Sequence, residues 1–104
     1  MTYEDLDPQL MPWSKSRGLH VFTKHRDYDV RTIHVVDDSG DIYEMSVTPQ
    51  NTNDPEILIG LWDKKKRTES IKIGLEDLTD GLEIAYEKIE SWIKERGHSR
   101  TIYK

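Results

Sequence analysis

Between Leu19 and Ile73 the hydrophobic residues recur with a period of two, which is typical of strands with one buried face. The pattern predicts strands at residues 19–23, 30–36, 42–47, 56–62 and 69–73. The acidic, Ser- and Gly-containing stretch at residues 37–41 predicts a tight hairpin, because glycine adopts positive φ at little cost. The third strand alternates between apolar and polar residues, as in a sheet with one solvated face, whereas the fourth is apolar on both faces and is predicted to be central or covered.

From Leu75 the apolar period becomes that of a helix. The stripe has steps of three and four residues and consists of Leu75, Leu78, Leu82, Ala85, Ile89 and Ile93. Gly97 follows as a C-cap candidate. An amphipathic helix and a one-sided sheet bury their apolar surfaces best against each other. The predicted fold class is therefore α+β: an antiparallel β-meander of four to five strands with one long C-terminal amphipathic helix packed across one face.

The chain of 104 residues corresponds to one domain. Residues 1–18 are predicted to be an irregular N-terminal arm, because Pro8 and Pro12 interrupt regular structure. Trp13 in this arm is expected to cover the core, with a ligand anchor as the alternative. Residues 19–97 are predicted to form a single α+β domain, and residues 98–104 a short C-terminal tail.

The composition indicates where the protein works and what it binds. Twenty acidic and 15 basic residues give a net charge of −5, which favours a basic partner, although moderate acidity can also serve solubility alone. The chain has no cysteine, so a reducing compartment is expected, and a thiol nucleophile or cysteine zinc site is excluded. No stretch resembles a signal peptide or approaches the roughly 18 apolar residues of a membrane span. The predicted location is cytoplasmic, without membrane association.

Sequence motifs of catalysis are missing. The chain has no glycine-rich phosphate-binding loop and no G-x-S-x-G element. The acidic hairpin at residues 37–41 does not have the ligand spacing of an EF-hand. Four histidines are the possible nitrogen ligands for a metal, and isolated histidines are more often structural or solvated: His20, His25, His34 and His98. We therefore expect a protein that is not an enzyme and has no metal or cofactor.

The outer face of the predicted helix is acidic, with seven carboxylates between Glu76 and Glu95 against two lysines. Such a face is either an ordinary solvated surface or an electrostatic docking surface for a basic protein. In the docking hypothesis, carboxylates of the helix or of the segment from Asp37 to Glu44 mimic phosphates, and Trp92 or Trp62 anchors the contact. The candidate partner-binding residues are Glu83, Glu87, Glu90, Trp92, Asp37, Asp38 and Asp41.

A basic run follows Trp62 at residues 64–67 and gives an alternative hypothesis. Positive charges at a hairpin tip could hold a phosphate backbone while the indole stacks on a base. The same charges could instead be a solvated loop that discourages aggregation of strand edges. The candidate nucleic-acid-binding residues are Trp62, Lys64, Lys65, Lys66 and Arg67.

Two resemblances bear on these hypotheses. The strand-to-helix segment Ile71-Lys72-Ile73-Gly74-Leu75-Glu76-Asp77-Leu78 resembles the end of small single-stranded-DNA-binding transcriptional coactivators with a ββββα fold, which implies a DNA-binding dimer. In size, charge and layout the whole chain is similar to bacterial toxin-immunity proteins and phage-encoded inhibitors, which implies occlusion of a basic partner such as a nuclease. The first hypothesis is thus an inhibitor, the second a single-stranded nucleic-acid binder, and the third an enzyme subunit or accessory domain.

Overall fold

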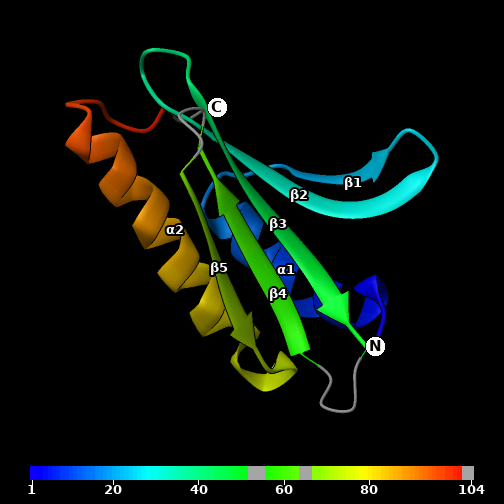
Figure 1. The fold of residues 1–104 in the computed structure, drawn as a ribbon. Coiled ribbons are helices and arrows are strands. Elements are labelled where there is room, and N and C mark those ends of the chain that lie inside the picture. Colours follow the sequence, from blue (N-terminus) through cyan, green and yellow to red (C-terminus); the bar gives the residue numbers. More distant parts are fainter. Residues whose placement is uncertain (52–55, 64–66, 102–104) are drawn as a thin grey trace.

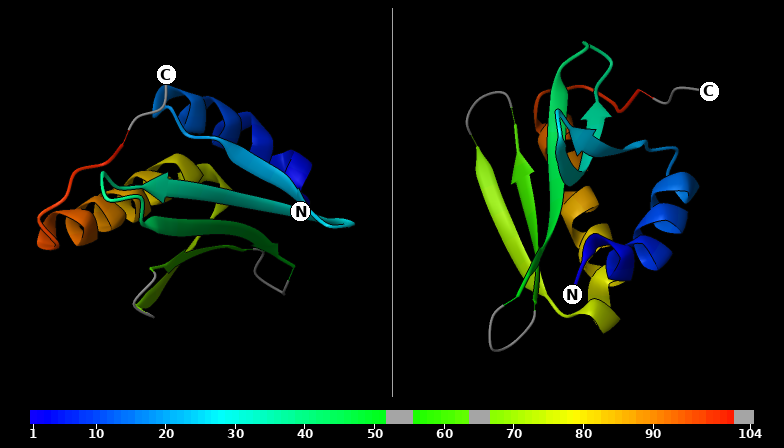
Figure 2. Two further views of the ribbon diagram at one scale, coloured as in Figure 1. Left: turned by 90° about the horizontal axis from the view of Figure 1, so that it is seen from above. Right: turned by 90° about the vertical axis from the view of Figure 1, so that its right-hand side faces the viewer.

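The computed structural model describes residues 1–51, 56–63 and 67–101, and shows one antiparallel sheet with two helices on one side (Figures 1 and 2). The elements are α1 (Tyr3–Ser16), β1 (Val21–His25), β2 (Tyr28–Val36), β3 (Ile42–Gln50), β4 (Glu56–Trp62), β5 (Thr68–Ile73), a 3₁₀ turn (Leu75–Asp77) and α2 (Leu78–Glu95). The strand order is β1-β2-β3-β4-β5, so each strand pairs with its neighbours in sequence. This confirms the predicted α+β fold with a meander and a long C-terminal helix packed against it.

The N-terminal arm predicted at residues 1–18 is instead largely the helix α1, and that prediction is wrong. The side chains that α1 buries are spaced by four and three residues and are Leu6, Leu10 and Trp13. Pro8 and Pro12 are exposed, and each removes one backbone donor from the helix. The helix forms nevertheless, because burial of its apolar stripe against the domain stabilises it more than local propensity destabilises it. The buried position of Trp13 agrees with its expected role in covering the core.

The core lies between the helices and the face of the sheet that they cover. That face contributes side chains from every second position of the strands, including Ile33, Val35, Tyr43, Met45, Val47, Ile57, Ile59 and Leu61. Gly81 lies where α2 crosses the sheet, and a Cβ there would come within 2.8 Å of Cδ1 of Ile73. The glycine therefore permits the close approach of α2 to β4 and β5.

The segment predicted as a C-terminal tail lies against the β2–β3 hairpin as far as Thr101. Gly97 has φ of 75° and ends α2, so that the chain reverses direction. The Thr101 N–H then donates to the Val36 carbonyl at 2.8 Å, and the Asp38 N–H donates to the Ser99 carbonyl at 2.8 Å. These bonds tie the end of the described chain to the sheet. Within the described ranges, no helix is long and apolar enough to cross a membrane.

Candidate functional site

The face of the sheet opposite the two helices, here called the open face, presents a row of large side chains. The strand register sets Glu44 of β3 between His34 of β2 and Trp62 of β4. Five large hydrophobic side chains are exposed in the described residues, and three of them lie on this face: Phe22, Ile42 and Trp62. Apolar side chains gathered on one solvated face, with polar groups between them, are the usual composition of a recognition surface.

The rings on the open face touch one another. The centroid of Phe22 lies 4.7 Å from that of His20 and 4.9 Å from that of His34. His34 Nε2 lies 3.3 Å from Glu44 Oε1. Beyond Glu44, the Trp62 side chain is 43% exposed although it belongs to a strand paired on both sides. β4 thus lies between two other strands, as predicted, but no described element covers its side chains on the open face.

A shallow pocket of about 360 Å³ lies at one end of this row, between His34, Gly40, Ile42, Glu44 and Trp62. Ile42 and Trp62 supply apolar surface, and Glu44 supplies a carboxylate beside it. This combination suits the side chain of a lysine or arginine, whose aliphatic stem packs on apolar surface while the cation meets a carboxylate or an aromatic face. The pocket therefore has the chemistry of a receptor for a basic side chain.

Glu83, a predicted partner-binding residue, is engaged within the domain. Its carboxylate accepts hydrogen bonds from the Arg17 guanidinium and, at 2.6 Å, from Trp13 Nε1. The Arg17 bond, followed by the Trp13 bond, lowers the pKa of Glu83. Glu83 thus joins α2 to the end of α1 and is not available to a partner in this structure.

Trp92, which was predicted to anchor a partner contact, is instead a core residue. Its side chain is only 2% exposed. The Arg67 guanidinium lies over the indole, 4.6 Å from the ring centroid, and closes it off from solvent. The apolar stripe of α2 is wide enough to include this position, so the tryptophan stabilises the domain rather than contacting a partner.

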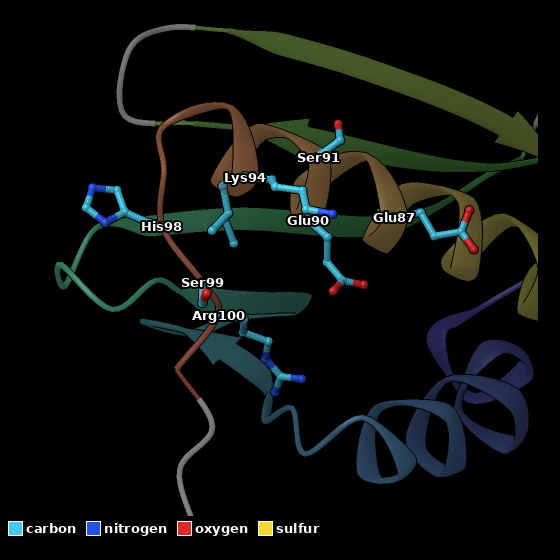
Figure 3. A pocket seen from close by; sticks show the side chains of 8 residues that line it. Glu87, Glu90, Ser91, Lys94, His98, Ser99 and Arg100 are labelled. Carbon is cyan, nitrogen blue, oxygen red and sulfur yellow. The ribbon is translucent and has the colours of Figure 1, made fainter.

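Glu87 and Glu90 remain exposed and make no ion pair with a described residue. They line a surface pocket of about 400 Å³ between α2 and the segment after it, together with Ser91, Ile93, Lys94, His98, Ser99 and Arg100 (Figure 3). The Arg100 guanidinium donates to Oη of Tyr86 on α2 at 2.8 Å and to the Gly18 carbonyl at 3.1 Å. The pocket walls thus carry charges of both signs, without a site selective for either.

Asp37 is buried and organises the hairpin, so it is also not available as a partner-binding carboxylate. Its Oδ1 accepts hydrogen bonds from the backbone N–H groups of Ser39 and Asp41 at 2.9 and 3.0 Å, and from Ser39 Oγ at 2.6 Å. Burial raises the pKa of Asp37, but these hydrogen bonds outweigh it and the pKa is lowered. Asp38 lies 2.7 Å from His98 Nδ1 and links the hairpin to the segment after α2.

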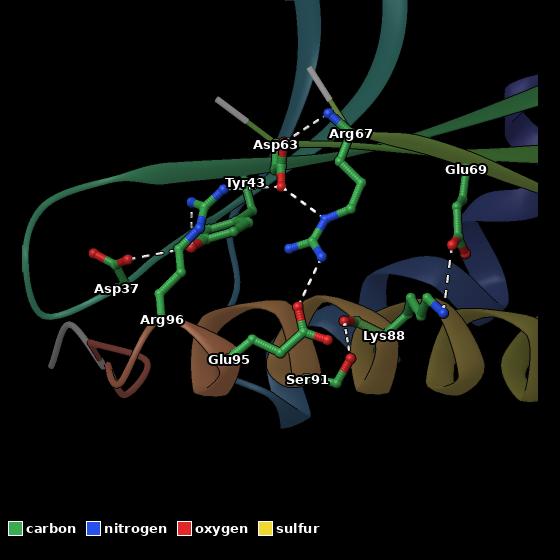
Figure 4. Close-up of polar contacts among 9 residues, drawn as sticks. All are labelled: Asp37, Tyr43, Asp63, Arg67, Glu69, Lys88, Ser91, Glu95 and Arg96. Carbon is green, nitrogen blue, oxygen red and sulfur yellow. Dashed lines mark hydrogen bonds and ion pairs between the residues drawn. The ribbon is translucent and has the colours of Figure 1, made fainter. Parts of the chain in front are cut away.

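A polar network around a buried carboxylate connects the end of β4 with the C-terminal end of α2 (Figure 4). Asp63 is fully buried and accepts from the Arg67 N–H at 2.8 Å, from Arg67 Nε at 3.1 Å and from Arg96 Nη2 at 3.0 Å. Arg67 also donates to Glu95 at 2.7 Å, and Arg96 donates to Tyr43 Oη at 2.8 Å. Burial raises the pKa of Asp63, but the Arg67 hydrogen bonds and the charges of both arginines lower it.

This network changes the interpretation of the basic run. Arg67 is engaged by Asp63, Glu95 and the ring of Trp92, so it is not free for a phosphate as the nucleic-acid hypothesis expected. Lys64, Lys65 and Lys66 lie outside the described residues. Sequence reasoning missed the network, although the spacing of Asp63 and Arg67 across a predicted turn was a local signal for an ion pair.

The described part of the chain contains no group of three or more side chains that could hold a metal ion. Comparisons of the chain with protein-family models, with curated proteins and with solved structures found no match in any of the three. The class of the protein is thus defined by its structure, as an α+β domain with an open-faced five-stranded meander. Its function has to be argued from the chemistry of the surfaces.

Proposed function

We propose that this chain is a non-enzymatic protein-binding module that blocks a basic partner by occlusion, in the manner of an inhibitor or immunity-type protein. The contact surface is the open face. The observation that supports the proposal is the pairing of Trp62 with Glu44 on adjacent strands, at one pocket with Ile42. The predicted cytoplasmic location belongs to the same proposal.

The pocket selects a lysine or arginine of the partner. The aliphatic stem of that residue packs between Ile42 and Trp62, and the cation reaches the Glu44 carboxylate. A cation over an indole contributes about 0.5–2 kcal/mol, depending on how far solvent is excluded. In the free domain His34 pairs with the Glu44 carboxylate. The incoming cation replaces His34 as the partner of this carboxylate.

Charge on the helix side attracts the same partner from a distance. Most described arginines are engaged inside the domain: Arg17, Arg31, Arg67, Arg96 and Arg100. Glu87 and Glu90 are exposed carboxylates that form no ion pair with a described residue, and the chain as a whole has a net charge of −5. Such an excess raises the association rate of a basic protein rather than fixing its position. A nuclease, which presents a basic active site to its substrate, is the natural example.

The test begins with capture of a partner from nuclease-treated lysate, followed by calorimetric titration of the purified partner. Trp62→Ala is expected to weaken binding about 30-fold, as removal of an interface anchor does. Glu44→Gln is expected to weaken it about 10-fold and to reduce its salt dependence. Glu56→Gln is the matched control, since Glu56 belongs to the far end of β4, and it should bind as the wild type does. Wild-type affinity in both Trp62→Ala and Glu44→Gln would overturn the proposal.

Single-stranded nucleic-acid binding is the second candidate, because Phe22, His34 and Trp62 offer ring surfaces on one open face. Glu44 lies within this row and would repel a phosphate backbone. Titration of a fluorescent single-stranded oligonucleotide separates the two functions. Tight binding that falls steeply with salt, and is lost when Lys64, Lys65 and Lys66 are replaced by Gln, would favour the nucleic-acid function.

A further inference from the structure

The two outer edges of the sheet differ in how they are protected. At the β1 side of the sheet, the pairing of β1 with β2 shifts register between Phe22 and Lys24, and Lys24 forms an ion pair with Asp29 of β2. Bulges and charged side chains are the usual means by which proteins prevent strand edges from pairing. β5 is a regular strand of six residues without proline, and no described segment pairs with its outer edge. Its free N–H and C=O groups are thus a template for another strand.

The α2 helix presents an apolar side chain beside this edge. Ile84 is 55% exposed, whereas the residues of the helix's main apolar stripe are buried. Together with Ile71 it lines a groove of about 410 Å³ along β5 and α2, which run side by side in Figure 1. Gly81 approaches Ile73 and Lys88 pairs with Glu69, so Ile84 lies level with Ile71 near the middle of β5.

We propose that the β5 edge and the adjacent side of α2 form the interface of a homodimer. The occupant is a second copy of this chain, because the surface is complementary to itself. Asp80, Ile84 and Lys88 are spaced by four residues and lie along one side of the helix. A two-fold axis near Ile84 sets the two Ile84 side chains against each other, and sets each Asp80 opposite Lys88 of the other copy.

The strands are compatible with the same axis. Antiparallel pairing of two β5 strands about Ile71 places Ile71 opposite itself on the covered face. On the open face it places Ser70 opposite Lys72, and no two like charges face each other. Asp80 makes no ion pair with a described residue, so the dimer gives it a counter-charge that the single chain does not. Two five-stranded sheets would thereby become one continuous sheet with both open faces on the same side.

Sedimentation equilibrium of the purified full chain over a concentration series tests the proposal without any partner or ligand. The wild type is expected to be a dimer at micromolar concentration. Asp80→Lys, which places two lysines opposite each other, and Ile84→Asp are each expected to raise the dimer dissociation constant at least 10-fold. Glu4→Lys is the matched control, because Glu4 is an exposed carboxylate in the first turn of α1 as Asp80 is in the first turn of α2, and it should leave the constant unchanged.

Thermal melts by circular dichroism establish that each variant is folded, and Asp80→Lys serves if Ile84→Asp does not fold. A wild type that remains monomeric at several hundred micromolar overturns the proposal. A dimer that neither Asp80→Lys nor Ile84→Asp weakens also overturns it. The measurement is independent of the proposed function, since Trp62→Ala and Glu44→Gln should sediment as the wild type does.

Discussion

The two faces of the sheet are made by the same strands but differ in the side chains that they carry and in how far these are buried. On the covered face, alternate side chains are fully buried aliphatic or aromatic groups packed against α1 and α2. On the open face, the positions between them hold small residues such as Ser46 and Gly60, next to the exposed rings of Phe22 and Trp62. Because strand side chains alternate, each strand contributes to stability with one set of residues and, in the proposed function, to recognition with the other. The comparison predicts that equal truncations on the two faces have unequal effects.

The sharpest contrast is between two tryptophans. Trp92→Ala, on the covered side, is expected to lower the free energy of unfolding by about 3–5 kcal/mol through lost burial and a residual cavity. Trp62→Ala removes the same side chain from the open face and is expected to cost about 1 kcal/mol or less. Urea denaturation followed by circular dichroism measures both. Equal losses would contradict the division of roles between the faces.

Next in size is the removal of the buried carboxylate. Asp63→Ala is expected to destabilise the domain by about 3 kcal/mol, because Arg67 and Arg96 lose their shared acceptor. Glu95→Gln removes the exposed end of the same network and is expected to cost about 0.5 kcal/mol. Chemical denaturation of the two variants, measured side by side, compares their losses in the free energy of unfolding. A loss from Asp63→Ala as small as that from Glu95→Gln would show that the buried network contributes little.

A smaller loss is expected from the first helix. Leu10→Ala should destabilise the protein by about 2–3 kcal/mol, since Leu10 is fully buried between α1 and the rest of the core. Pro12→Ala at an exposed position of the same helix should be neutral or stabilising, because it restores a backbone donor. Thermal unfolding would measure both. An unchanged melting temperature in Leu10→Ala would mean that α1 is not part of the cooperative unit.

The smallest effect concerns pH. Asp63 and Asp37 have lowered pKa values in the folded state, so both are easier to protonate when the chain is unfolded. Their contribution is therefore fully present above the unfolded pKa of about 3.9 and is lost as pH falls through the folded values. Urea midpoints measured from pH 6 to pH 3 should decline, and Asp63→Asn should flatten the decline below about pH 4. If the urea midpoints of Asp63→Asn declined in parallel with those of the wild type, Asp63 would not be a cause of the loss of stability at low pH.

Local patterns predicted the sheet and α2, because alternation and helical spacing report directly which side chains are buried. They failed for α1, because two prolines in this segment indicated irregular structure. The helix forms because its apolar stripe packs against the rest of the domain. They also failed where a residue's partner is distant in sequence. Glu83 was predicted to be a partner-binding carboxylate, but it pairs with Arg17, which lies 66 positions away, and nothing near Glu83 in the sequence indicates that pairing.

The same principle limits what could be predicted of the candidate site. Trp62 was identified from its place beside basic residues, yet its neighbour Glu44 on β3 follows from the strand register. The register depends on the geometry of each hairpin and on which face of the sheet is buried. Both are determined only when the strands have paired in the folded chain. Arg96 meets Asp63 for a similar reason, since the end of α2 returns to the end of β4.

The pairing of Thr101 with Val36, and the contact of Arg100 with Gly18, join the last described residues to segments that are made much earlier in the chain. During synthesis on the ribosome, the meander can begin to pair while α2 is still inside the exit tunnel. The covered face, however, stays without its main helix, and α1 without Glu83, until the chain has emerged to about residue 101. This domain therefore completes its fold only after residue 101 has left the tunnel, and a ribosome that stalls before that point would leave an apolar sheet exposed to chaperones and proteases.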